Sequence, residues 1–139
     1  MSKPKVGFIC VHNSCRSQMA EAISKLYAAD VFEAYSAGTE TKPQINPDAV
    51  RIIKQLYDVD MTLTQSSKLI EDLPPVDVVI TMGCGVAETC PLYLGMQIDE
   101  DWGLDDPAGK GIEQVRPIRD AVRERVVDLI DRIEKQKSW

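Results

Sequence analysis

A cysteine and an arginine six positions apart are the residues of this 139-residue sequence best placed to do chemistry. Cys10 ends a short apolar run, Arg16 follows after five residues, and Ser17 comes next. A loop between a strand and a helix points backbone N–H groups inward, and the helix N-terminus adds a positive dipole end. Arg16 can hold two oxygens of a tetrahedral anion with its planar fork. The spacing therefore predicts an anion-binding loop that favours the nucleophilic thiolate form of Cys10.

The residues between Cys10 and Ser17 are expected to shape this loop. Ser17 can hydrogen-bond the thiolate, and Asn13 can lock the loop conformation. Cys15 is expected to pack against the site or tune it, and His12, the single histidine, is given no role as a base. The alternative interpretation is that Cys10 is a small buried residue ending a strand. The residues expected to surround a bound anion are Val11, His12, Asn13, Ser14, Cys15, Arg16 and Ser17.

An acid is expected on another loop, because the oxygen that leaves after thiolate attack must be protonated. Asp105 and Asp106 are the candidates. Pro107 stiffens the loop after Asp106 and Gly109 permits a turn, which favours Asp106 as the acid. The alternative is ordinary turn chemistry at this pair of residues.

A second pair of thiols, Cys84 and Cys90, follows the clearest predicted strand of the chain. The carboxyl ends of parallel strands share one edge of a sheet, so this segment can lie near the Cys10 loop. Cys84 can then attack a Cys10 adduct, and Cys90 can take over the bond as a Cys84–Cys90 disulfide. The alternatives are two unrelated buried cysteines or a metal site. A closed zinc site takes four ligands, and only His12 offers an imidazole.

Strands that alternate with helices are predicted along the whole chain, which implies one α/β domain over residues 1–139. Such a chain forms a parallel sheet with right-handed crossovers, covered on both faces. Met19, Ile23, Leu26 and Tyr27 give the first helix an apolar face. The predicted elements are strands 6–10, 32–37, 76–82 and 96–102, and helices over 17–29, from Asn46 onward, and from about Pro117 onward.

Composition limits the kinds of partner and the cellular compartment that we expect for this protein. A formal charge of −6 argues against an extended nucleic-acid surface, which needs clustered Lys and Arg. The sequence has no apolar stretch of roughly 18 residues and no secretory signal pattern, so we expect a cytoplasmic protein with no membrane segment. Four cysteines in such a chain are not expected to form a structural disulfide framework.

Several separated motifs, in this order, resemble those of arsenate reductases built on the low-molecular-weight protein tyrosine phosphatase fold. They cover residues 10–22, 36–39, 84–90 and 105–109, and the resemblance extends over nearly the whole chain. The resemblance implies a three-layer sandwich in which a four-stranded parallel sheet is flanked by helices. It also implies the reduction of arsenate to arsenite without a metal or any other cofactor.

The resemblance assigns a role to each candidate residue. Cys10 attacks arsenic, Arg16 and the loop amides hold the arsenate oxygens, and Asp106 assists the departure of hydroxide. Cys84 then displaces arsenite to give a Cys10–Cys84 disulfide, and Cys90 receives the bond for reduction by thioredoxin. Related reductases instead use a low-molecular-weight thiol with a glutaredoxin-like partner, and the sequence leaves that donor open.

Two other functions share part of this residue set. A phosphotyrosine phosphatase would use Cys10, Arg16 and Asp106 through a phosphocysteine, although Ala108 stands where such enzymes usually carry an aromatic residue. A non-enzymatic protein could bind arsenite through Cys84 and Cys90 as a soft dithiol.

Some members of the family also bind potassium, through residues matching Asn13, Glu21 and Ser36. Lys68 lies close to the position of a later ligand and would repel a cation, so we expect no such site.

Overall fold

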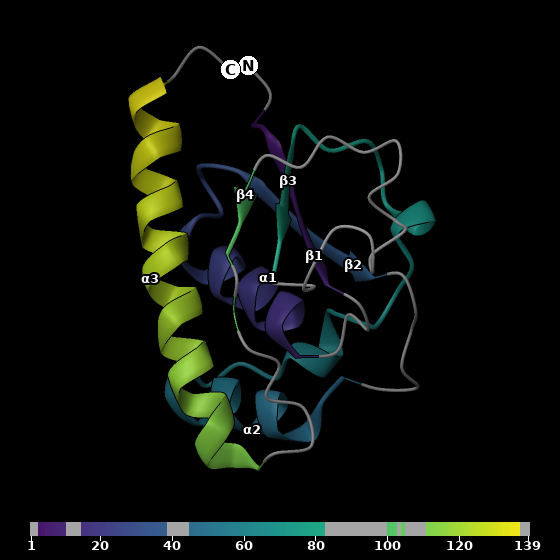
Figure 1. Cartoon of the computed structure of the whole chain (residues 1–139), viewed down its shortest axis with the longest axis vertical. Coiled ribbons are helices and arrows are strands. Elements are labelled where there is room, and N and C mark those ends of the chain that lie inside the picture. The colour runs from purple at the N-terminus through teal and green to yellow at the C-terminus, as the bar shows by residue number, and fades with distance from the viewer. Residues whose placement is uncertain are drawn as a thin grey trace.

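The computed structural model describes residues 3–10, 15–38, 45–82, 100–102, 104 and 111–136, and Figure 1 shows how their helices and strands are arranged. In chain order the elements are β1 (Lys5–Cys10), α1 (Arg16–Tyr27), β2 (Glu33–Gly38), α2 (Pro47–Tyr57), the short 3-10 helices η1 (Met61–Leu63) and η2 (Ile70–Asp72), β3 (Val78–Thr81), β4 (Glu100–Asp101) and α3 (Ile112–Gln136).

The four strands form one parallel sheet in the order β2-β1-β3-β4. Cys10 lies opposite Gly38 of β2, and Ile9 lies opposite Thr81 of β3. The α/β fold class expected from the sequence, with a four-stranded parallel sheet flanked by helices, is confirmed. From β1 the strand order departs in both directions, so the carboxyl end of β1 lies at a topological switch point, where open α/β sheets bind ligands.

The main core lies between one face of the sheet and the helices α1, α2 and α3. Val6, Phe8 and Cys10 of β1 point toward this side because alternate residues of a strand face the same way. Phe8 is central, with its ring 6.5 Å from that of Phe32 and 5.5 Å from that of Trp102. On the opposite face, a smaller cluster of described residues contains Ile9, Ala37, Val79, Leu73 and Val76.

Helix α2 begins at the position predicted from the sequence, with Asn46 as its N-cap. Asn46 Oδ1 accepts hydrogen bonds from the backbone N–H groups of Asp48 (2.8 Å) and Ala49 (3.2 Å), and Pro47 occupies the first helical position. Asp58 ends the helix in the left-handed conformation, with φ of 57°.

The apolar face predicted for α1 is wrong at its carboxyl end. Leu26 and Tyr27 are 42% and 45% exposed, whereas every residue from Arg16 to Ser24 is buried. The reason is that the first turns of α1 are enclosed on several sides, by the sheet, by α3 and by residues near position 65. The buried polar side chains of Arg16, Gln18 and Glu21 have hydrogen-bond partners instead of facing water.

The start predicted for the last helix is also wrong. Helix α3 begins at Ile112, and Pro117 lies inside it. A proline within a helix removes one backbone hydrogen bond, but burial of Val115 anchors the turn before it. Val122, Val126, Leu129 and Ile133, which recur in the sequence at intervals of three and four residues, are all buried on one face of the helix.

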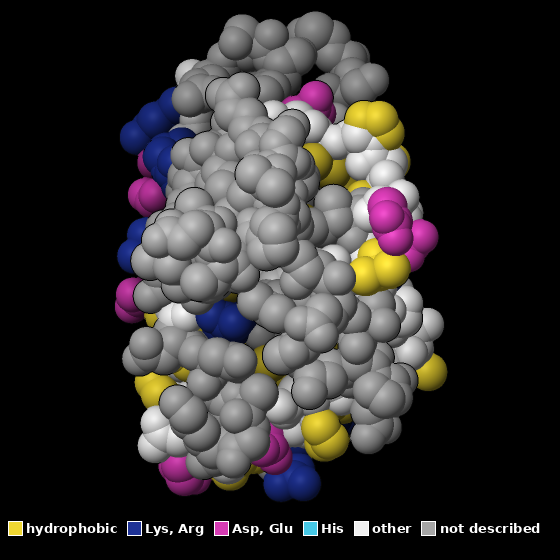
Figure 2. All heavy atoms as spheres, turned by 45° about the vertical axis from the view of Figure 1, so that its right-hand side comes forward, with side chains coloured by type: hydrophobic (Ala, Val, Ile, Leu, Met, Phe, Trp, Pro, Cys, Tyr) yellow, Lys and Arg dark blue, Asp and Glu magenta, His cyan; other side chains and the backbone are white. Residues whose placement is uncertain are grey.

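The surface of α3 carries charges of both signs. Arg132 pairs with Asp128 and Lys135 with Asp131, each four residues apart. Basic and acidic side chains are accordingly interspersed along the left edge of the face in Figure 2. Among the described residues, no helix is both long enough and apolar enough to cross a bilayer.

Candidate active site

The Cys10 sulfur lies at the carboxyl end of β1, beside the start of α1. Its Sγ is 2.9 Å from the Oγ of Ser17, and both residues are buried. A hydroxyl at this distance can donate to a thiolate and stabilise its charge. The contact distinguishes Cys10 from an apolar residue that merely ends a strand, because its sulfur has a polar neighbour.

Arg16 is the first residue of α1 and is 5% exposed. Its Nη1 donates to the backbone oxygen of Met82 (2.8 Å) and to that of Leu104 (2.9 Å). The arginine predicted to bind an anion is therefore buried, six residues after Cys10 in the sequence, and it contacts the backbone just beyond β3 and β4. A buried guanidinium at a helix N-terminus makes this edge of the sheet electropositive.

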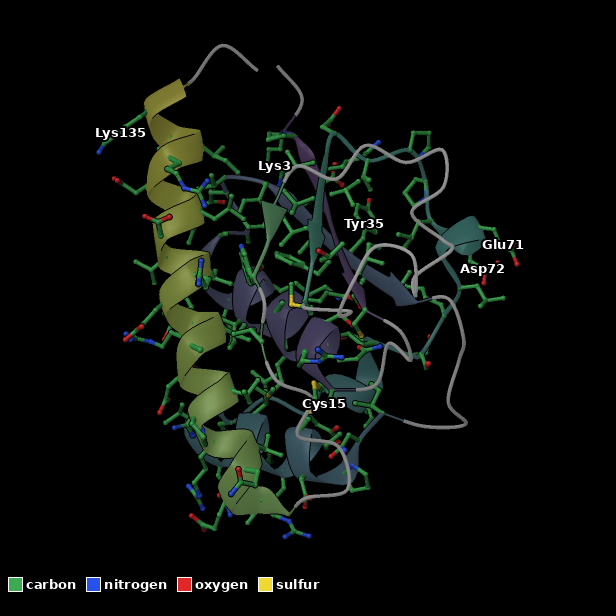
Figure 3. The ribbon with its side chains drawn as sticks, viewed as in Figure 1. Lys3, Cys15, Tyr35, Glu71, Asp72 and Lys135 are labelled. Carbon is green, nitrogen blue, oxygen red and sulfur yellow. The ribbon has the colours of Figure 1, made fainter. Side chains whose placement is uncertain are left out.

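Cys15 immediately precedes α1, where Figure 3 labels it, and is 2% exposed. Its backbone oxygen accepts a hydrogen bond from the N–H of Met19 (2.9 Å). The side chain of Cys15 is therefore inside the protein, and its role at the site stays a prediction.

The remaining predicted site residues lie outside the part of the chain that the structure describes. They are Val11, His12, Asn13 and Ser14 of the loop, the two later thiols Cys84 and Cys90, and the acid Asp106 with its neighbour Asp105. Met82 and Leu104, the two residues bound by Arg16, stand two positions before Cys84 and Asp106 respectively.

A model of the low molecular weight phosphotyrosine protein phosphatase family matches residues 5–139. The chain belongs to this family. Arsenate reductase 1 of Staphylococcus epidermidis is 36% identical over 134 residues, which are 96% of this chain and all of the relative. Glutaredoxin arsenate reductase of Synechocystis is 39% identical over 132 residues, covering 93% of this chain and 98% of the relative.

Solved structures of an arsenate reductase and of a phosphatase are similar to this chain. An arsenate reductase in the phosphate binding state superposes with a TM-score of 0.80 and 39% identity, covering 96% of this chain and 99% of the other. A low molecular weight protein tyrosine phosphatase from T. tengcongensis superposes with a TM-score of 0.73 and 28% identity, covering 94% and 99%.

One buried carboxylate of this family member joins three parts of the fold. Glu21 Oε1 accepts from Ser36 Oγ (2.6 Å), and Lys25 Nζ lies 2.6 Å from Oε2. Lys68 Nζ is 3.8 Å from Oε1, so the lysine expected to exclude a cation has its ammonium beside this carboxylate. Among the described residues, no group of three His, Cys, Asp or Glu side chains is arranged to hold a metal ion.

A pair of buried glutamines next to the site was not predicted from the sequence. Gln65 Nε2 donates to the backbone oxygen of Gln18 (3.0 Å) and to its Oε1 (2.7 Å), and Gln18 Nε2 donates to the backbone oxygen of Ser66 (3.0 Å). We call these contacts the glutamine clamp. A glutamine in a helix normally indicates a solvent-facing position, so no signal in the sequence marked Gln18 as buried.

Proposed function

We propose that this protein reduces arsenate to arsenite, with Cys10 as the nucleophile. The observation that carries the proposal is the buried 2.9 Å contact between Cys10 Sγ and Ser17 Oγ at the switch point of the sheet, where the preceding residue Arg16 is also buried. Membership of the family and the arsenate reductases similar over nearly the whole chain support the choice of substrate.

In the first step, the Cys10 thiolate attacks arsenic(V) and forms a sulfur–arsenic bond. Ser17 donates to the thiolate before the attack, and Arg16 with the loop amides of residues 11–16 neutralises the arsenate oxygens. Asp106 gives a proton to the departing hydroxide, which leaves as water.

In the second step, the Cys84 thiolate attacks the Cys10 sulfur. The electron pair of the sulfur–arsenic bond stays with arsenic, which leaves as arsenite, and a Cys10–Cys84 disulfide forms. Cys90 then attacks Cys84, which frees Cys10 and moves the oxidised state to a Cys84–Cys90 disulfide. Two electrons from an external dithiol complete the cycle, and we propose thioredoxin as that donor, in the cytoplasm.

A coupled assay tests the relay. Arsenate should drive NADPH oxidation through thioredoxin and thioredoxin reductase, and Cys10→Ser, Cys84→Ser and Cys90→Ser should each abolish it. A parallel reaction with glutathione and a glutaredoxin tests the other donor, which the name of the Synechocystis relative makes relevant. Full arsenate turnover by Cys84→Ser with a small thiol would reject the three-cysteine relay.

The phosphatase alternative is measured with an aryl phosphate in place of arsenate. The family description and the T. tengcongensis relative favour including it. We expect only weak hydrolysis, unaffected by Cys84→Ser or Cys90→Ser, because a phosphocysteine needs water and not a second thiol. Efficient aryl phosphate hydrolysis with no arsenate-dependent NADPH oxidation would make the protein a phosphatase.

A further inference from the structure

Arg16 makes contacts that holding an anion does not require. At the carboxyl edge of the sheet, the backbone N–H of Met82 donates to Ile9 O (2.9 Å), and that of Trp102 donates to Thr81 O (2.8 Å). Just beyond these bonds, the backbone oxygens of Met82 and Leu104 both accept from Arg16 Nη1. One side-chain nitrogen therefore continues the hydrogen bonding where the sheet ends.

A guanidinium can bind an anion and hydrogen-bond to these two carbonyl groups at the same time. Nη1 carries two N–H groups, and the two backbone oxygens take them. The Nε–Nη2 edge lies on another side of the planar fork and is the edge that suits a side-on, bidentate anion. Binding an anion on that edge leaves the two contacts with Met82 and Leu104 in place.

The two residues that Arg16 holds are placed alike in the sequence. Met82 stands two residues before Cys84, and Leu104 stands two residues before Asp106. We infer that Arg16 is also a positioning residue, whose Nη1 fixes the starting points of the segments that carry the second thiol and the acid. This inference rests on the roles proposed above for Cys84 and Asp106.

We call the two hydrogen bonds from Arg16 Nη1 to the backbone oxygens of Met82 and Leu104 the bridge. Its surroundings favour these bonds. Arg16 and Met82 are buried and Leu104 is half-buried, so water competes little for these hydrogen bonds. A tether that keeps the first residues of a segment at the site raises the effective concentration of a group two residues further on. A lysine carries one ammonium on a flexible stem and does not reproduce the fixed, planar orientation of the two Nη1 N–H groups.

Amide hydrogen exchange in the absence of any oxyanion tests the bridge itself. In Arg16→Ala, the amides of Met82 and Trp102 should exchange roughly tenfold faster relative to Phe8, the size expected for loss of a charge-assisted hydrogen bond. Ser17→Ala, a change at the neighbouring residue that touches neither carbonyl, should leave both amides as in the wild type. Arg16→Lys should change both amides in the same direction, and it serves if Arg16→Ala does not fold.

A disulfide exchange reaction tests whether the bridge positions Cys84. One equivalent of an aromatic disulfide reagent first forms a mixed disulfide on Cys10 and releases one coloured thiolate. Cys84 then attacks the Cys10 sulfur and releases the second, giving a Cys10–Cys84 disulfide that mass spectrometry identifies. Measured in a Cys15→Ser, Cys90→Ser background, in which the Cys10–Cys84 disulfide cannot pass to Cys90, this second phase should be roughly tenfold slower in Arg16→Ala, because the effective concentration of Cys84 falls.

The outcomes separate the inference from the proposed function, since neither measurement contains arsenate. Faster exchange at both amides together with a slower second phase supports the inference. Unchanged exchange at either amide, or an unchanged second phase, overturns it. Failure of the proposed function would show instead as no arsenate-dependent NADPH oxidation by the wild-type protein.

Discussion

Ser17 contributes the hydrogen bond that separates a reactive thiol from a buried structural one. Its hydroxyl is fully buried and lies 2.9 Å from the Cys10 sulfur. Hydrogen bonds to charged groups contribute about 1.5–3 kcal/mol. If the thiolate is the reacting form, the loss of this bond should appear in the rate of the first chemical step.

Ser17→Ala should therefore lower the single-turnover rate of arsenate reduction by roughly 10–100-fold, with arsenate in saturating amount. Ser24→Ala is the matched control: it also removes a buried hydroxyl from α1, and Ser24 Oγ has no hydrogen-bond partner among the described residues. Its rate should stay within about twofold of the wild type, as expected for a change away from the reacting atoms. Equal rates for the two variants would remove Ser17 from the mechanism.

For the individual residues of the site, the sequence predicted which side chains take part but not all of their hydrogen-bond partners. The spacing of Cys10, Arg16 and Ser17 indicated one site, and the structure places the three together. The carbonyl groups bound by Arg16 were not predictable, because backbone oxygens look alike in a sequence and only the strand order brings Met82 and Leu104 to one place.

Among the elements, α1 depends on a neighbouring segment that has little regular structure of its own. The 64–69 segment contacts the first turns of α1 through the glutamine clamp, and it contacts β2 through the N–H of Gly38, which donates to Lys68 O (2.9 Å). Gly38 and Leu69 also form a parallel bridge. The sequence predicted both α1 and β2. It did not predict that residues 64–69 contact both elements, because side-chain amide contacts leave no periodic pattern.

Removal of the clamp should cost stability. Gln65→Ala takes both donors from Gln18 and leaves a buried amide oxygen without this partner, which costs about 1–3 kcal/mol. Urea denaturation should show that decrease in the free energy of unfolding. Gln55→Ala, the same substitution at an exposed position of α2, should change stability by no more than about 0.5 kcal/mol. A Gln65→Ala protein as stable as Gln55→Ala would mean that the clamp does not hold the segment.

Over the whole molecule, the helices form one core with the sheet, and α3 supports the site from a distance. In Figure 1, α3 runs along the length of the protein, and it packs against both α1 and α2. Its alternation of buried and exposed positions was predictable because the helical period is regular. The first residue of α3 was not predictable, because burial of Val115 outweighs the usual tendency of a proline to begin a helix.

Leu129→Ala should test whether this core acts on the site only through global stability. Leu129 is 3% exposed, and truncating such a side chain costs about 2–5 kcal/mol through lost burial and the cavity left behind. Val127 is 47% exposed on the same helix, so Val127→Ala should stay within about 0.5 kcal/mol of the wild type. Both variants should keep arsenate turnover per folded molecule within about twofold, since neither change touches the reacting groups. A Leu129→Ala protein that is folded at the assay temperature yet inactive would show instead that α3 sets the position of α1 at the active site.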